Sequence, residues 1–242
     1  MVKEDECNSI LERLRSMGNP KNVEGMARFG LVSKKVLGIN KPVLDGIARD
    51  VGKGHGLALK LWDSGIYEAR ILAALVDEPE KVTERQMEEW VKDFDNWGVC
   101  DNACMNLFDK TPFAYRKALE WSSRNEEFVK RAGFALMASL VVHDKKAKDH
   151  DFLKFLPLIK KESYDDRNFV RKSVNWALRQ IGKRNPNLNR AAIETSEKIL
   201  ETRSKAARWI ASDALRELES PAVKKRLARM KKSKNLMPIL CL

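Results

Sequence analysis

The chain has 242 residues, of which 43% are hydrophobic and 33% are charged, and its formal net charge is +12 at pH 7. This composition predicts a soluble globular protein and is large enough for one large domain or two small ones. The longest apolar runs are too short to span a bilayer, and no secretory signal precedes the first expected helix. We therefore expect a cytoplasmic protein with no membrane partner.

Apolar residues recur at helical spacing along the whole chain, and the alternation that is typical of strands is nearly absent. Breaks rich in Gly, Asn and Pro divide the sequence into stretches of roughly 12 to 20 residues. The breaks are Gly18-Asn19-Pro20, Asn40-Lys41-Pro42, Gly52-Lys53-Gly54, Glu78-Pro79, Thr111-Pro112, Asn185-Pro186 and Ser220-Pro221. These features predict an all-α protein, with one repeat domain over residues 1–235 and a short tail over 236–242. The clearest apolar groups are Ile10, Leu14 and Met17; Val43, Ile47 and Val51; Leu72, Leu75 and Val76; and Leu153, Leu156 and Ile159.

Several of the expected helices resemble one another. Residues 68–75, 129–136, 170–178 and 206–211 each place one or two basic residues before a row of small and apolar residues. When Arg131, Lys172 and Arg208 are aligned, the spacings are 41 and 36 residues, which is typical of HEAT and armadillo repeats. The sequence thus predicts an α-solenoid of HEAT-like antiparallel helix pairs, curved into a superhelix with a concave basic face.

The positive charge is concentrated near the C-terminal end. Residues 203–242 contain 11 basic and 3 acidic residues, which is a net charge of +8 out of the chain's +12. Such a surface attracts polyanions by counterion release and electrostatic steering. A solubilising tail would explain residues 224–234 alone, but basic residues also recur inside the repeated segments. The charge pattern therefore favours contact with nucleic acid.

Trp97 and Asp101 form an unusual pair within this pattern. They are four residues apart, so a helix presents both on one face. Asn96 is a favourable N-cap, which would put Asp101 in or near the first turn, where the helix dipole stabilises an ionised carboxylate. An indole beside a negative charge, in a basic protein, suggests a site for a cationic group carried on a polyanion. Alkylated DNA fits that description.

Other residues that could carry chemistry fit structural roles. The histidines lack the spacing of metal ligands, so we expect them on the surface or in loops, and no paired cysteine framework is present. We expect the remaining tryptophans in the core and the cysteines of residues 100–104 as buried reduced thiols. The residues concerned are His55, His143 and His150; Trp62, Trp90, Trp121 and Trp209; and Cys100 and Cys104.

Four stretches, taken in order, resemble the HEAT-like DNA alkylation repair glycosylases of the AlkD type over nearly the whole chain. Asn19-Pro20, Gly25-Met26-Ala27-Arg28-Phe29 and Leu37-Gly38-Ile39 resemble that family's N-terminal helical hairpin. Trp97-Gly98-Val99-Cys100-Asp101 resembles its Trp-x-x-x-Asp signature, and Arg131 stands where the family has an Arg opening an inner helix. The longest shared stretch runs from Phe169 to Arg179 and closes with Lys183-Arg184-Asn185-Pro186.

The resemblance implies a monomeric, nucleoid-associated enzyme that removes cationic N3- and N7-alkylated purines from double-stranded DNA, with no metal and no cofactor. It implies Asp101, Trp97 and Trp176 as the catalytic residues. Phe29 replaces a Tyr that is frequent in the family, so a hydroxyl contact to DNA is missing at that position. The residues expected to bind DNA are Arg131, Arg179, Lys172, Lys183 and Phe29.

Alkylation at N3 or N7 makes the purine cationic, so it leaves easily and needs little help from a general acid. An ionised Asp101 about 4 Å from the developing sugar cation would contribute about 4 kcal/mol at an effective dielectric constant near 20. Trp97 and Trp176 would add cation–π stabilisation. Two alternatives remain: a non-catalytic HEAT-repeat protein that binds damaged or branched DNA, and a HEAT scaffold that binds proteins.

Overall fold

The computed structural model describes residues 4–33 and 35–236. Those residues form helices joined by short connections and contain no strand, which confirms the prediction of an all-α protein. The chain divides into two compact units, Met1–Ala114 and Tyr115–Leu242. The expectation of one domain over residues 1–235 stays a prediction. Of the tail expected over residues 236–242, Leu236 is the last residue of a helix, and residues 237–242 lie outside the described residues.

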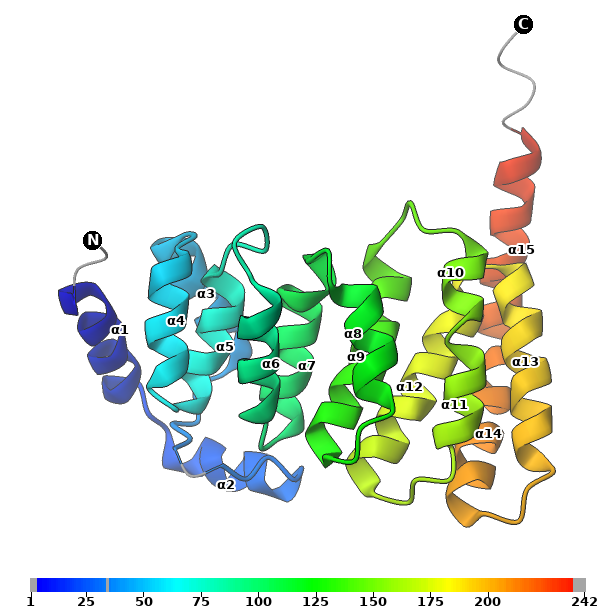
Figure 1. Cartoon of the computed structure of the whole chain (residues 1–242), viewed down its shortest axis with the longest axis horizontal. Coiled ribbons are helices and arrows are strands. Elements are labelled where there is room, and N and C mark those ends of the chain that lie inside the picture. Colours follow the sequence, from blue (N-terminus) through cyan, green and yellow to red (C-terminus); the bar gives the residue numbers. More distant parts are fainter. Residues whose placement is uncertain (1–3, 34, 237–242) are drawn as a thin grey trace, which may run out of the picture. The chain divides into compact units, whose positions relative to one another are not determined.

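The first unit contains seven α-helices and a 3-10 helix in its described part (Figure 1). Two predicted breaks coincide with helix starts: Asn19 caps α2 with Pro20 in its first turn, and Asn40 precedes α3 with Pro42 in its first turn. Both starts follow from the preference of proline for the first turn of a helix. The helices are α1 (Glu4–Ser16), α2 (Pro20–Arg28), α3 (Lys41–Val51), α4 (His55–Asp63), α5 (Tyr67–Val76), α6 (Glu84–Lys92), α7 (Trp97–Asn106) and η1 (Phe108–Lys110).

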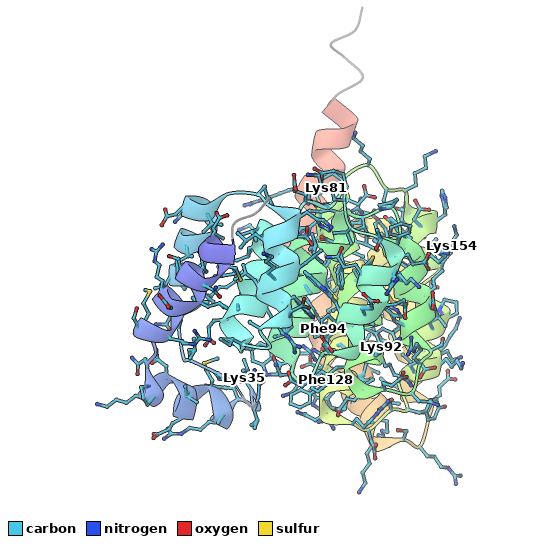
Figure 2. All side chains as sticks on the ribbon, turned by 60° about the vertical axis from the view of Figure 1, so that its left-hand side comes forward. Lys35, Lys81, Lys92, Phe94, Phe128 and Lys154 are labelled. Carbon is cyan, nitrogen blue, oxygen red and sulfur yellow. The ribbon has the colours of Figure 1, made fainter. Side chains whose placement is uncertain are left out.

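An aromatic cluster forms the core of the first unit. The rings of Trp62 and Trp90 stack with their centroids 3.9 Å apart and their planes within 4°. Phe94, labelled in Figure 2, packs against Trp62 at 6.0 Å and against Phe108 at 6.4 Å. This cluster joins α4, α6 and η1, and it confirms the prediction that Trp62 and Trp90 belong to the core.

The second unit begins with α8, whose first residue is the last of the first unit. Asn185 caps α13, with Pro186 in the first turn, so the predicted break at Asn185-Pro186 separates two long helices. The helices are α8 (Ala114–Ser122), α9 (Glu127–His143), α10 (Asp149–Leu153), α11 (Leu156–Glu162), α12 (Asn168–Arg184), α13 (Pro186–Leu200), α14 (Lys205–Leu218) and α15 (Pro221–Leu236).

Three helices of the second unit, α9, α12 and α14, lie in sequence, with α12 packed against both of the others (Figure 1). Along each pair of helices, residues with higher numbers on one helix contact residues with higher numbers on the other. The helices therefore run parallel. This arrangement results from stacking helix pairs, in which every second helix returns to the same layer. The contacts join Arg131 to Phe169 and Val141 to Arg184 between α9 and α12, and Arg171 to Trp209, Asn175 to Ile210, Arg179 to Asp213 and Lys183 to Glu217 between α12 and α14.

Buried asparagines bridge neighbouring parallel helices in both units. In the first unit, Asn102 of α7 donates from Nδ2 to the carbonyl of Ile71 on α5, at 3.1 Å. In the second unit, Asn175 of α12 donates in the same way to the carbonyl of Ile210 on α14, at 3.0 Å. Because both amides are buried, losing such a bond would leave a polar group unsatisfied. The asparagines thus fix the register of the helices that carry Trp97 and Trp176.

The predictions of burial for the remaining tryptophans and for the cysteines of residues 100–104 are confirmed with one exception. Trp121, Cys100 and Cys104 are buried as expected, and burial raises the pKa of the Cys104 thiol, which keeps it protonated and unreactive. The prediction of a core position for Trp209 is wrong, because this residue is 39% exposed. It lies outside the apolar stripe with which α14 packs, which runs through Ala207, Ile210, Ala211, Ala214 and Leu218.

No helix in the described chain is long and apolar enough to cross a membrane.

Candidate nucleic-acid interface

The start of α7 places the Trp97–Asp101 pair. Asn96 is the N-cap, and its side chain accepts a hydrogen bond from the Val99 amide at 3.0 Å, as the sequence predicts. Trp97 is therefore the first helical residue, and Asp101 follows the first turn rather than lying in it. Both side chains are half-buried. The pair shares one helix face, with the carboxylate one turn further along than the indole.

The indole of Trp97 is held by the segment that follows α2. Its Nε1 donates to the main-chain carbonyl of Phe29 at 3.1 Å. Phe29 itself is 77% exposed, so its side chain is accessible to solvent. The structure thus brings together two residues of the predicted site, Trp97 and Phe29, that are 68 positions apart.

Tyr67 supports the same helix end from α5, and the sequence did not single it out. A Cβ at Gly98 would lie 2.5 Å from the Tyr67 hydroxyl and 2.9 Å from Leu31 Cδ1. Only glycine at position 98 lets the phenol pack this closely against α7. Burial, followed by the charges of Glu68 and Asp101, raises the pKa of Tyr67, so its hydroxyl stays protonated and can donate a hydrogen bond.

Glu68 fixes the segment that leads from Phe29 to α3. Its carboxylate is fully buried and accepts hydrogen bonds from the backbone amides of Leu37, Gly38 and Ile39, the shortest being 2.7 Å to Gly38. Gly38 has a φ of +81°, a conformation that favours glycine. The Leu37-Gly38-Ile39 stretch is therefore the partner of a buried carboxylate, and its turn explains the glycine at position 38.

Trp176 lies on α12 of the second unit, on the same stripe as three predicted cations. Lys172, Trp176, Arg179 and Lys183 are spaced by four, three and four residues, so they follow one helix face. Trp176 is half-buried and Lys172 is exposed. The stripe offers an indole flanked by positive charge, which suits a negatively charged ligand with an apolar surface.

Two of these cations already have acidic partners. Glu217 of α14 pairs with Lys183 at 2.7 Å and with Arg179 at 2.8 Å, and Asp213 lies 3.7 Å from Arg179. Partial burial opposes ionisation of Glu217, but the hydrogen bond and charge of Lys183, together with Arg179, keep the pKa of Glu217 below its ordinary value. The stripe is therefore less positive than the sequence of α12 alone indicates.

Arg131 opens α9 and is only 7% exposed. Its guanidinium donates to the main-chain carbonyl of Phe169, at the start of α12, at 2.7 Å. This bond ties the N-terminal ends of two parallel helices together. The residue is thus placed at a helix junction, and its contact with DNA stays a prediction.

A cavity of about 910 Å³ lies at the C-terminal ends of α9 and α12, within the second unit. Of the predicted residues, Lys183 lines it. The Lys and Arg residues on its wall outnumber the acidic residues, among which is Asp149. The cavity is therefore electropositive. The Lys183-Arg184-Asn185-Pro186 stretch noted in the sequence lines it, and Arg226 comes from the basic run near the chain end. The basic residues of the wall are Lys145, Lys148, Lys183, Arg184 and Arg226, with His150 beside them.

The described residues contain no group of three or more His, Cys, Asp or Glu side chains able to hold a metal ion. His55 is half-buried and bonds to Asp77 at 2.7 Å through Nδ1, rather than lying free on the surface. This pair belongs to the junction between α4 and the end of α5, so a structural role explains it.

Comparison with solved structures identifies the fold. The chain is similar to a protein described as belonging to "a new family of proteins related to the HEAT-like repeat DNA glycosylases with affinity for branched DNA structures", with a TM-score of 0.71 and 17% identity, covering 87% of this chain and 94% of that one. A designed armadillo repeat protein in complex with a (KR)4 peptide matches with a TM-score of 0.39 and 15% identity, over 83% and 85% of the two chains. The first likeness confirms the HEAT-like solenoid fold, whereas the curvature and the concave basic face stay predictions.

No curated protein sequence matches the chain significantly. The family described as "DNA alkylation repair enzyme", however, matches residues 10–218, which covers most of the chain and every residue of the predicted site. The chain therefore belongs to the family of DNA alkylation repair enzymes.

Proposed function

We propose that this protein is a DNA glycosylase that excises cationic N3- and N7-alkylated purines from duplex DNA. The observation that carries the proposal is the geometry at the start of α7. There an indole anchored by the Phe29 carbonyl stands one helical turn before a half-buried carboxylate, Asp101. Membership of a DNA alkylation repair family supports the same substrate class.

The chemistry follows from the charge of the lesion. A purine alkylated at N3 or N7 carries a positive charge, so the glycosidic bond breaks towards an oxocarbenium-like sugar and a neutral leaving base. Asp101 stabilises the sugar cation electrostatically and positions the attacking water. Trp97 presents a π-face to positive charge, for about 0.5–2 kcal/mol. Trp176, on α12 of the second unit, stays a predicted catalytic residue with the same cation–π role. The water oxygen bonds to C1′ and loses a proton, which yields the free base and an abasic site.

The cations of the second unit would hold the DNA backbone. Lys172 is exposed on the α12 stripe, and Lys183 also lines the electropositive cavity. Contacts of this kind position a duplex without reading its sequence. The proposal therefore predicts recognition through the charge of the lesion, with little dependence on the neighbouring bases.

A direct test is incubation with duplex DNA carrying a single N7-methylguanine, followed by detection of the released base by mass spectrometry. Release of N7-methylguanine, with no release of uracil or hypoxanthine from matched duplexes, is the expected result. Neutral bases leave slowly without a general acid, so efficient release of uracil would contradict the electrostatic mechanism. Asp50→Asn, a change in an exposed carboxylate of α3, is a control for general effects of losing a negative charge.

A second candidate is a non-catalytic HEAT-repeat protein that binds damaged or branched DNA. The similar solved protein is itself described as having affinity for branched DNA. Tight binding to duplex or branched DNA, with no base released from any cationic lesion, would select this candidate.

A further inference from the structure

Trp209 is an exposed tryptophan on a helix that otherwise packs with small residues. It lies near the start of α14, and 39% of its surface is accessible. The neighbouring positions Ala206, Ala207 and Ile210 face the core. The indole is therefore partly covered by its neighbours, and the exposed part of it is accessible to a ligand.

Arg171 of the neighbouring helix α12 is stacked on this indole. Its guanidinium carbon lies 4.7 Å from the centroid of the Trp209 ring. The Arg171 Nε is buried and has no hydrogen-bond acceptor among the residues that the structure describes. The guanidinium lies over one face of the ring at a distance suited to a cation–π contact. We call Trp209 and Arg171 together the α14 stacking site.

The charge around the α14 stacking site is mostly positive. Neither α12 nor α14 has an acidic residue in its first turn, so the positive ends of both helix dipoles are uncompensated there. Two acidic residues, Asp166 and Glu201, are exposed on the preceding connections. A third, Asp213, lies one turn after Trp209 on α14 and is paired with Arg179 and Arg216. The exposed cations of the same region are Lys172, Arg203, Lys205 and Arg208.

We propose that the α14 stacking site binds an unpaired base of DNA on Trp209, while the surrounding cations hold the adjacent phosphates. An exposed indole cannot stack on a phosphate, nor on the outside of an intact duplex, where the faces of the bases are covered by their neighbours. An unpaired base offers a free π-face, and exposed aromatic rings within basic grooves bind single-stranded nucleic acid in this way. This inference rests on the proposed binding of DNA, and it adds a preference for DNA with unpaired bases that is independent of base excision.

The test compares two DNAs of the same sequence, an intact duplex and a duplex with a central single-stranded gap of several nucleotides. Dissociation constants are measured by fluorescence anisotropy at one fixed salt concentration, because salt strongly changes such affinities. Trp209→Ala should weaken binding to the gapped DNA by about tenfold, which is within the range for losing one stacked base. Binding to the intact duplex should change little.

Two further variants separate stacking from folding. Trp209→Phe keeps an aromatic face and should recover most of the affinity for gapped DNA. Tyr164→Ala removes an aromatic residue that is 56% exposed on the connection before α12 and does not stack with Arg171, and it should leave the preference for gapped DNA unchanged. Thermal unfolding of each variant checks that the second unit remains folded.

The outcomes distinguish this inference from the proposed function. If Trp209→Ala lowers the affinity for both DNAs equally, or changes neither affinity, the α14 stacking site does not bind unpaired bases. A protein partner would then be the alternative occupant. If the wild-type protein binds neither DNA, the proposed function and this inference fail together. Excision of N7-methylguanine by Trp209→Ala at the wild-type rate is compatible with the inference, because the α14 stacking site has no part in the chemistry.

Discussion

The indole nitrogen of Trp97 donates a 3.1 Å hydrogen bond to the main-chain carbonyl of Phe29. This bond joins the first residue of α7 to the segment that follows α2, so the orientation of the indole depends on a part of the chain far away in sequence. Tyr67 packs against Gly98, the next residue of α7. The geometry around the Trp97–Asp101 pair is thus set by residues from three separate segments.

The first prediction concerns the close contact at Gly98. In Gly98→Ala the new methyl group would overlap the Tyr67 hydroxyl and Leu31, so we expect a loss of about 1–3 kcal/mol in the free energy of unfolding. Chemical denaturation of the variant gives this quantity. Gly46→Ala, in α3, is the matched control, because a Cβ there meets nothing within 4 Å. The control should stabilise the protein by about 0.5–1 kcal/mol, as for alanine in a helix interior. Equal stability of Gly98→Ala and wild type would contradict the packing of Tyr67.

The second prediction concerns Asp101. Asp101→Asn removes the negative charge with little change in shape, so we expect excision of N7-methylguanine to fall by about a hundredfold or more. DNA affinity should stay nearly the same, because the charge acts on the transition state. Single-turnover rates at saturating protein and separate binding measurements give the two quantities. An unchanged excision rate would remove Asp101 from the mechanism.

The third prediction concerns Glu217, which pairs with both Arg179 and Lys183. Glu217→Gln should free these two cations for phosphate contacts, so DNA affinity should rise. The slope of log K against log salt should become steeper by about 0.9 for each added contact. Glu201→Gln removes the same charge at an exposed position of α13's C-terminal end and should change the slope less. Equal slopes for the two variants would show that Arg179 and Lys183 do not reach the DNA.

The fourth prediction concerns the stability of the second unit in acid. Burial opposes ionisation of Asp165, but hydrogen bonds from Arg167 at 2.9 Å and from Lys130 keep the pKa of Asp165 below its ordinary value. A lowered folded-state pKa contributes stability above the unfolded value of about 3.9 and loses it as the pH falls through the folded value.

Asp165→Asn should therefore lower the free energy of unfolding at neutral pH by about 1–3 kcal/mol. The difference from wild type should shrink below about pH 4, where the wild-type carboxyl becomes protonated. Urea unfolding at several pH values measures both effects. Asp50→Asn, at an exposed ion pair with Arg13, should show almost no difference at any pH. A constant deficit for Asp165→Asn across the whole pH range would contradict the ionic role.

Local patterns in the sequence were enough to predict the elements that carry the site. Asn96 caps α7, Asn185 caps α13, and the apolar spacing marks helices throughout the described chain. Capping and amphipathic spacing are properties of a few consecutive residues, so they can be recognised without knowing the neighbours of a helix. The pairing of Trp97 with Asp101 on one face follows from the same local geometry.

The burial and partners of the charged and aromatic residues were decided by the tertiary structure. Arg131 and Lys172 occupy equivalent positions in the aligned repeats, yet Arg131 is buried against the Phe169 carbonyl and Lys172 is exposed. Trp209 looked like a core residue, but the apolar stripe of α14 turns it outward, and Arg171 covers one face of its ring.

The same limit applies to Glu217 and Tyr67, which act on predicted site residues from other helices. Glu217 meets Arg179 and Lys183 only because α12 and α14 run parallel and in register, and Tyr67 reaches Gly98 only because α5 packs against α7. The sequence alone determined the helices, their caps and the faces on which chemistry could occur. The tertiary structure decided which charges are neutralised and which rings are exposed, because electrostatic and stacking energies depend on distances across helices that no local pattern encodes.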